Sequence, residues 1–287
     1  MVMDFRKKLR IWVHSIRGFR TIHWIMMVAI GYIIRPDLNS SNLLDFLLPA
    51  LSVAFLWHYT TILNDIYDIE IDKKAHPDRP LVKGEISIEE YHRLGLLSLM
   101  SAGILSALSG FLVFVGFLLY FFMAVIYSKP PLRIRNRAYG TIIMGLASGV
   151  EIFSGYFSHT WIWDMNIFYI NSINGLLIPS ILIAISALTV APNITAYLDY
   201  ESDVEAGANT IYTVLGKEKG KKMVSYMLVV LFLLPAVIFP TLMNIGIGAI
   251  LGFSSYLFFY RFTCVKCVFV AYFSELIYFM LYYIFLK

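Results

Sequence analysis

Long apolar stretches recur along this sequence, and they limit it to a membrane-embedded architecture. Of its 287 residues, 59% are hydrophobic and only 15% are charged, whereas soluble domains carry about 25% charged residues. A transmembrane helix needs about 20 consecutive apolar residues, whereas a transmembrane β-strand shows about ten alternating ones. The continuous runs therefore predict an all-α, polytopic membrane protein. We expect nine transmembrane helices, in the ranges 18–34, 43–63, 94–110, 111–127, 139–157, 174–198, 223–239, 243–260 and 268–286.

The basic residues predict the orientation of these helices. If the N-terminus is cytoplasmic, all but two of the 23 Lys and Arg residues fall on the cytoplasmic side, and the exceptions are Arg35 and Lys287. Cytoplasmic loops of membrane proteins are enriched in Lys and Arg. We therefore predict a cytoplasmic N-terminus and a C-terminus outside. The same placement accounts for the net charge of +4, so this charge does not indicate nucleic-acid binding.

Two acidic motifs follow apolar ranges at the predicted cytoplasmic face. "DIEID" covers residues 68–72 and "DYESD" covers residues 199–203, and both read D-x-E-x-D. Residues four apart share one face of a helix, so each motif predicts a polar stripe. The two stripes consist of Asn64, Asp68 and Asp72, and of Asp199 and Asp203.

The matching motifs also predict an internal repeat. Many membrane folds are built from repeated halves, and both motifs follow an even-numbered apolar range on the same side. We expect a single domain over 1–287, with pseudo-repeat halves 18–127 and 139–260 and a ninth helix at 268–286.

The stripes predict a divalent-metal site. Like charges at helical spacing repel each other, and burial raises the cost of the ionised form, so two facing stripes require cations. The ligands are hard oxygens without clustered Cys or His, which favours Mg²⁺ or Mn²⁺. We expect all five stripe residues to be metal ligands, with Asp68 and Asp199 acting in catalysis through shared ions. The alternative is that these acids are solvated near the headgroup layer.

Basic residues close to the motifs predict a phosphate site. Mg²⁺ usually bridges carboxylates to substrate phosphates, and Arg binds phosphate through a planar fork. A soluble nucleotide would not require nine helices, and the sequence has no G-x-x-x-x-G-K-[ST] loop. A polyprenyl diphosphate fits, with its head at the cytoplasmic mouth and its chain in the bilayer. The expected substrate-binding residues are Arg79, Lys83, Lys129, Arg133 and Arg135.

At these positions the sequence resembles the UbiA superfamily of intramembrane prenyltransferases. The family pattern N-D-x-x-D-x-x-x-D is matched at 64–72, and an R-P-L-x-x-G pattern follows at 79–84. The family's D-x-x-x-D motif is matched at 199–203. The segment "YSKPPLRIR" at 127–135 is similar to Y-S-x-P-P-L-R-x-K, with Arg135 in place of the final Lys.

The resemblance implies a central cavity surrounded by the helices, Mg²⁺ between the two acidic motifs, and lateral access for the prenyl chain. It also implies that Tyr127 binds substrate. The expected reaction is the Mg²⁺-dependent transfer of a polyprenyl group from its diphosphate to a lipophilic acceptor, with release of diphosphate. We expect this enzyme in the cell membrane, with its active site toward the cytoplasm.

Several functional alternatives remain open at this level. The acceptor could be an aromatic quinone precursor or a prenyl-lipid acceptor such as a glycerol-phosphate ether lipid. A cation-coupled secondary transporter would also use repeated carboxylates, although such sites lie near the membrane midplane. A UbiA-type terpene cyclase would ionise the same diphosphate without an acceptor.

Two pairs of residues fall outside these motifs. Glu151 and Glu275 lie within apolar ranges, where an acid is a functional candidate by default, and we expect Glu151 to be internally hydrogen-bonded. Cys264 and Cys267 form a lone C-x-x-C. Structural zinc usually takes four ligands, so we expect two reduced thiols.

Overall fold

The computed structural model describes residues 10–13, 15, 17–137, 139–159 and 175–286, and within these residues the chain is helical without strands. The elements are α2 (Gly18–Ile34), η1 (Leu38–Ser40), α3 (Leu44–Tyr67), α4 (Ile69–Ala75), α5 (Ile88–Leu108), α6 (Phe111–Ser128), η2 (Ile134–Asn136), α7 (Gly140–Tyr156), α8 (Leu177–Ala196), α9 (Tyr200–Glu205), α10 (Ile211–Leu215), α11 (Lys217–Leu233), α12 (Pro235–Ile238), α13 (Leu242–Tyr260) and α14 (Val265–Leu286).

Six helical segments in the described chain are long and apolar enough to cross a membrane. They are α3, α6, α8, the continuous α11–α12 segment, α13 and α14. Helix α2 has a shorter apolar part, Arg20–Ile34, and α5 and α7 also overlap expected ranges. The chain is therefore an all-helical, multi-pass membrane protein.

Several helices extend past the apolar ranges that the sequence marks. Helix α3 continues to Tyr67, so Asn64 is still within it. Helix α5 begins earlier than expected, at Ile88, where the Ser87 side chain accepts the backbone N–H of Glu90 at 3.2 Å. Helix α11 begins at Lys217, so its first turns carry charge. Hydropathy marks only the part of a helix that meets lipid, whereas capping residues set where the helix ends.

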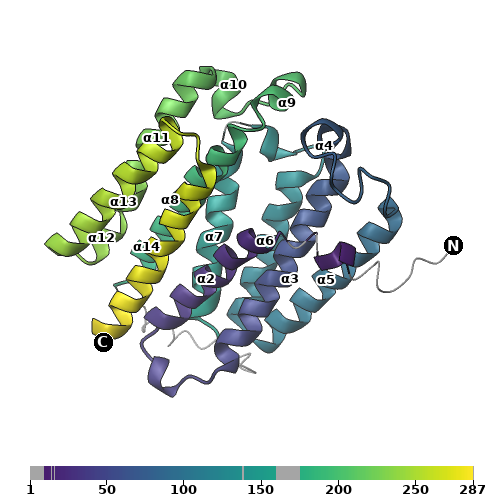
Figure 1. Cartoon of the computed structure of the whole chain (residues 1–287). Helices are drawn as coiled ribbons and strands as arrows, with labels where there is room; N and C mark the ends of the chain where they lie inside the picture. The colour runs from purple at the N-terminus through teal and green to yellow at the C-terminus, as the bar shows by residue number, and fades with distance from the viewer. Residues whose placement is uncertain (1–9, 14, 16, 138, 160–174, 287) are drawn as a thin grey trace.

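The long helices run side by side as a bundle, and the short helices α4, α9 and α10 gather at one of its ends (Figure 1). We call this the motif end, because both acidic motifs lie there. The C-terminus lies at the opposite end of the bundle (Figure 1). Helices α3 and α8 lead into α4 and α9, respectively, so the bundle itself carries the two motifs to a common end.

Glycines allow α2 and α7 to pack with their backbones in contact. A Cβ on Gly31 would overlap the backbone oxygen of Ile152, and a Cβ on Gly155 would overlap that of Val28. Small residues permit such close approach between membrane helices. This packing fixes α2 against α7 on one side of the bundle.

We expect Gly31→Ala to lower stability by about 1–3 kcal/mol, because the added methyl group meets backbone atoms that cannot move aside. Gly246→Ala, in α13, is the matched control, since a Cβ there meets nothing within 4 Å. The measurement is the thermal unfolding midpoint in detergent. Equal midpoints for the two variants would contradict the close contact.

The expectation of two reduced thiols is wrong, because Cys264 and Cys267 form a disulfide. Their Cα atoms lie 5.3 Å apart, within the usual range for a disulfide. The turn before α14 brings them together, with Thr263 at φ 53° and the backbone N–H of Cys267 donating to Cys264 Sγ at 3.3 Å.

Candidate functional site

A cavity of about 260 Å³ opens among the helices at the motif end. Its mouth is polar and is lined by both acidic motifs, by Arg79 and by Arg135. Its deeper wall is largely apolar and aromatic, with Trp24, Trp57 and Phe269 among the lining residues. Such a cavity suits an amphipathic ligand with a charged head and a hydrophobic chain.

The first acidic stripe is buried and paired with arginines. Asp68 ends α3 and precedes α4, and it is 1% exposed. Arg133 donates to Asp68 Oδ1 at 2.6 Å, and Arg135 forms a second ion pair with the same carboxylate. One helical turn later, Asp72 is paired with Arg79. The side chains expected to hold metal and those expected to hold phosphate therefore neutralise each other here.

The second stripe faces the first across the mouth. Asp199 precedes α9 and is partly exposed, whereas Asp203 within α9 is buried. His76 directly follows α4, and its Nε2 lies 3.9 Å from Asp199 Oδ1. Lys74 on α4 forms an ion pair with Glu205 on α9. These contacts hold the two motifs together although they are far apart in sequence.

The segment between α6 and α7 supplies two of the arginines. It contains the cis Pro130–Pro131 bond and then forms the short helix η2. Arg135 on η2 donates to Asn64 Oδ1 at 3.0 Å. The backbone oxygen of Asn136 accepts from Asn209 N–H at 2.9 Å, so η2 is tied to the segment that follows α9.

Not every residue expected to bind substrate lies in the cavity wall. The wall contains Asn64, Asp68, Asp72, Arg79, Tyr127, Arg135, Asp199 and Asp203. Arg133 reaches the site through Asp68. Lys83 and Lys129 are exposed and do not line the cavity. Glu151 and Glu275 are buried but also lie outside the wall.

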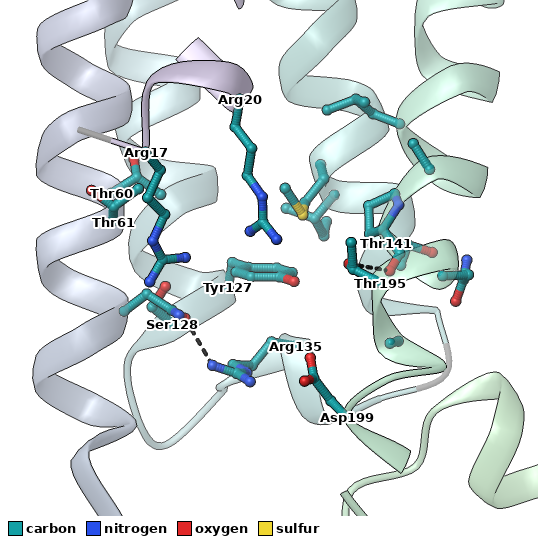
Figure 2. A pocket seen from close by; sticks show the side chains of 18 of the residues that line it. Arg17, Arg20, Thr60, Thr61, Tyr127, Ser128, Arg135, Thr141, Thr195 and Asp199 are labelled. Carbon is teal, nitrogen blue, oxygen red and sulfur yellow. Dashed lines mark hydrogen bonds between the residues drawn. The ribbon is translucent and has the colours of Figure 1, made fainter. Parts of the chain in front are cut away.

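The site residues expected from the sequence do not include three residues that lie at the mouth. Arg17 and Arg20 line the cavity at the start of α2, and Figure 2 shows both side chains reaching in from the side opposite Arg135 and Asp199. Asp65 is also absent from the expected site, because it does not share the four-residue spacing of Asn64, Asp68 and Asp72. The only available signal for the arginines was their three-residue spacing at a helix start.

Asp65 organises the arginines at the mouth. It is 5% exposed and forms ion pairs with Arg17 and with Arg79 Nη1, the latter at 3.0 Å. Tyr91 donates its hydroxyl to the other carboxylate oxygen of Asp65 at 3.0 Å. A carboxylate so fully satisfied by the protein is suited to positioning cationic side chains rather than to holding a ligand.

The donor set at the mouth fits Mg²⁺ chemically. Both stripes offer carboxylate oxygens, and Asn64 offers an amide oxygen. Asp68 Oδ2 is buried and lies against Arg135, its ion-pair partner. In the described part of the chain, no three His, Cys, Asp or Glu residues stand close enough to hold an ion as a group. The arginines supply the positive charge in this arrangement, and ligation would require them to turn toward another anion.

Burial shifts the acid–base properties of the motif acids. It raises the pKa of Asp72 to about 6, against the opposing effect of Arg79. It likewise raises the pKa of Asp203 to about 6, and the nearby Asp199 carboxylate adds to the rise. Both acids are therefore ionised at neutral pH at a cost to the fold. A bound cation would remove that cost.

We expect Asp203→Asn to stabilise the protein at pH 7.5 in EDTA by on the order of 1 to 3 kcal/mol. The carboxyl has a higher pKa folded than unfolded, so its ionisation destabilises the fold as pH rises from about 4 through 6. The gain should shrink toward zero near pH 4. The measurement is the thermal unfolding midpoint in detergent at both pH values.

The matched control is Asp78→Asn, because Asp78 is exposed and its removal should leave both midpoints unchanged. A lower midpoint for Asp203→Asn at pH 7.5 would show that the carboxylate stabilises the ligand-free mouth.

Comparison with known proteins identifies the family of this chain independently of the site geometry. The model of the UbiA prenyltransferase family matches residues 24–286. The chain is 31% identical over 175 residues to digeranylgeranylglyceryl phosphate synthase of Metallosphaera sedula, a match spanning 60% of this chain and 57% of that relative. It is 26% identical over 219 residues to the enzyme of the same name from Saccharolobus solfataricus, spanning 74% of this chain and 73% of the relative.

A solved structure shares the fold. A UbiA homolog from Archaeoglobus fulgidus bound to GPP and Mg²⁺ superposes with a TM-score of 0.70 at 20% identity, covering 96% of this chain and 98% of that one. Because the sequence identity is only 20%, this similarity is evidence for a shared fold alone.

Proposed function

This chain belongs to the UbiA prenyltransferase family, and we propose that it transfers a prenyl group from a prenyl diphosphate to a lipophilic acceptor and releases diphosphate. The observation that carries the proposal is the cavity itself. Two acidic motifs and a set of arginines meet at the mouth of the cavity, and the interior of the cavity below them is largely apolar. Cation-coupled transport is not favoured, because the acids lie beyond the ends of α3 and α8 and not near their centres.

We propose that Mg²⁺ is held at the mouth by Asn64, Asp68 and Asp72 on one side and by Asp199 and Asp203 on the other. When bound, Mg²⁺ would neutralise charge on the diphosphate as it departs. The carboxylates would exchange their arginine partners for the cation. The arginines would then be available to the phosphate oxygens.

The chain's own cations would complete the diphosphate site. Arg79 and Arg135 line the wall, and Arg133 lies directly behind Asp68. Arg stabilises developing phosphate charge through directed hydrogen bonds, and such preorganised donors contribute several kcal/mol to catalysis. Below the mouth, the rings of Trp24, Trp57 and Tyr120 pack together, with centroids 5.3 and 5.0 Å from Trp24. They would exclude water from the reacting carbon.

For the acceptor, we propose a glyceryl phosphate lipid that already carries one prenyl chain. The relatives from Metallosphaera sedula and Saccharolobus solfataricus bear the name digeranylgeranylglyceryl phosphate synthase. The mouth offers cations beyond those paired with the first stripe, since Arg20 enters from the opposite wall (Figure 2). A second phosphate-bearing ligand is consistent with this surplus of positive charge.

We propose that all nine long helices cross the cell membrane and that the motif end faces the cytoplasm. The charge distribution along the sequence supports this orientation. Thiol labelling in membrane vesicles tests it, after both native cysteines are replaced by serine. Asp78→Cys, at the motif end, should react only from the cytoplasmic side, and Asn39→Cys, in η1, only from outside. The reverse pattern would overturn the orientation.

The activity test incubates the purified protein with geranylgeranyl diphosphate, geranylgeranylglyceryl phosphate and Mg²⁺. Asp68→Asn and Asp199→Asn should each lower transfer at least about a hundredfold, the scale of losing one preorganised electrostatic contact. Removal of Mg²⁺ with EDTA should abolish transfer, and added Mg²⁺ should restore it.

Glu70→Gln is the control for these two variants, because Glu70 lies within the first motif but points to solvent with a 77% exposed side chain. It should keep full activity. Wild-type activity in Asp199→Asn would show that the second motif takes no part in the reaction.

A further inference from the structure

Three hydrogen-bonded side chains from three helices cross the wall of the cavity below its mouth. Tyr272 Oη on α14 lies 3.0 Å from His23 Nδ1 on α2, and His23 Nε2 lies 3.2 Å from Ser148 Oγ on α7. All three side chains are buried, with 6%, 5% and 0% of their surface exposed, respectively. Tyr272 and His23 line the cavity, whereas Ser148 lies behind them.

The network meets the cavity where its polar part gives way to its apolar part. His23 follows Arg20 by three residues on α2, which places it about 4.5 Å further along the helix axis. Tyr272 lies between Phe269 and Phe273, which also line the wall. A prenyl diphosphate with its head at the mouth and its chain below would place its first carbon at this level.

The other histidine in the wall is placed differently. His76 lies at the mouth, 3.9 Å from Asp199, and is 41% exposed. Among the cavity-lining residues that the structure describes, His23 is thus the imidazole that lies below the phosphate-binding groups. A histidine with a purely structural role in the core would not be expected to line the cavity, whereas both His23 and its hydrogen-bonded partner Tyr272 line it.

We propose that Tyr272 and His23 remove the proton from the acceptor hydroxyl during prenyl transfer, with Ser148 as the positioning residue. This inference rests on the proposed function. It concerns the proton of the acceptor hydroxyl, for which neither the acidic motifs nor the arginines provide a base.

The proton balance of the step is simple. The bond between the first prenyl carbon and the diphosphate oxygen breaks, and the electron pair leaves with diphosphate. The acceptor oxygen forms a bond to that carbon. Its hydroxyl proton passes to the Tyr272 oxygen as the Tyr272 proton passes to His23 Nδ1. The imidazolium returns a proton to water at the mouth after the product leaves.

Ser148 can accept a hydrogen bond from the His23 tautomer that this relay requires. Nδ1 must be unprotonated to accept from Tyr272, so Nε2 must carry the hydrogen. Ser148 Oγ lies where it can accept that N–H. The second hydrogen bond of a histidine determines which ring nitrogen is basic. Loss of Ser148 should therefore weaken the relay without removing it.

The experiment measures steady-state transfer from geranylgeranyl diphosphate to geranylgeranylglyceryl phosphate by the full chain, with Mg²⁺ present. Tyr272→Phe and His23→Gln should lower kcat at least about a hundredfold, within the range for general acid–base groups. The acceptor KM should change less than about threefold, because a group that acts only on the proton in the transition state contributes to kcat and not to acceptor binding. Ser148→Ala should lower kcat less than either.

Two further measurements separate this role from a structural one. Affinity for geranylgeranyl thiolodiphosphate, an analogue that resists ionisation, should stay within about twofold of wild type in all three variants. Tyr278→Phe is the matched control, because Tyr278 on the same helix donates to Asn244 Oδ1 at 2.7 Å and does not line the cavity. It should keep the wild-type kcat.

Unchanged kcat in Tyr272→Phe, with wild-type protein active, would overturn the relay alone. The relay would also be overturned if the variants lost affinity for the analogue by the same factor as they lost kcat. That result would show that the network only maintains the shape of the cavity wall. Wild-type protein that transfers to no acceptor would overturn the proposed function and the relay with it.

Discussion

The mouth of the cavity depends on buried pairing between aspartates and arginines. Asp68 is 1% exposed and is contacted by two arginines, and Asp72 and Asp65 share Arg79. A charge buried without a partner destabilises a protein by about 3–5 kcal/mol. The carboxylates and arginines must therefore enter the fold together. The ligand-free protein consequently holds these carboxylates and arginines together at the mouth.

The rest of the bundle serves to bring these charges to one end. Helices α3 and α8 end at the first and second motifs, and η2 is tied by its backbone to the segment after α9. The glycine contact fixes α2, which carries Arg20 at the mouth and His23 below it. A single cavity thus joins a charged mouth, an aromatic interior and a polar network on the wall. In the proposed reaction, the mouth would bind the leaving diphosphate, the aromatic interior would surround the ionising carbon, and the polar network would take the acceptor proton.

Local features of the site could be predicted from the sequence, and long-range ones could not. The four-residue spacing of Asp68 and Asp72 places both on one helical face whatever the tertiary fold, and both line the cavity. That Arg135 rather than Lys129 would reach the wall depends on how η2 turns back toward α3, which no local pattern encodes. The roles of Asp65 and Tyr91 depend on packing between α3 and α5 for the same reason. The Cys264–Cys267 bond likewise depends on a turn at Thr263, where a positive φ is unusual for a residue with a side chain.

The central claim is that a divalent cation converts this arginine–aspartate cluster into a diphosphate site. The most direct test is calorimetric binding of geranylgeranyl thiolodiphosphate to wild-type protein, first in EDTA and then in saturating Mg²⁺. The account predicts affinity at least about tenfold tighter with Mg²⁺, because the carboxylates otherwise retain the arginines and repel the ligand. Equal affinity under the two conditions would contradict it, since the arginines alone would then suffice to hold the diphosphate.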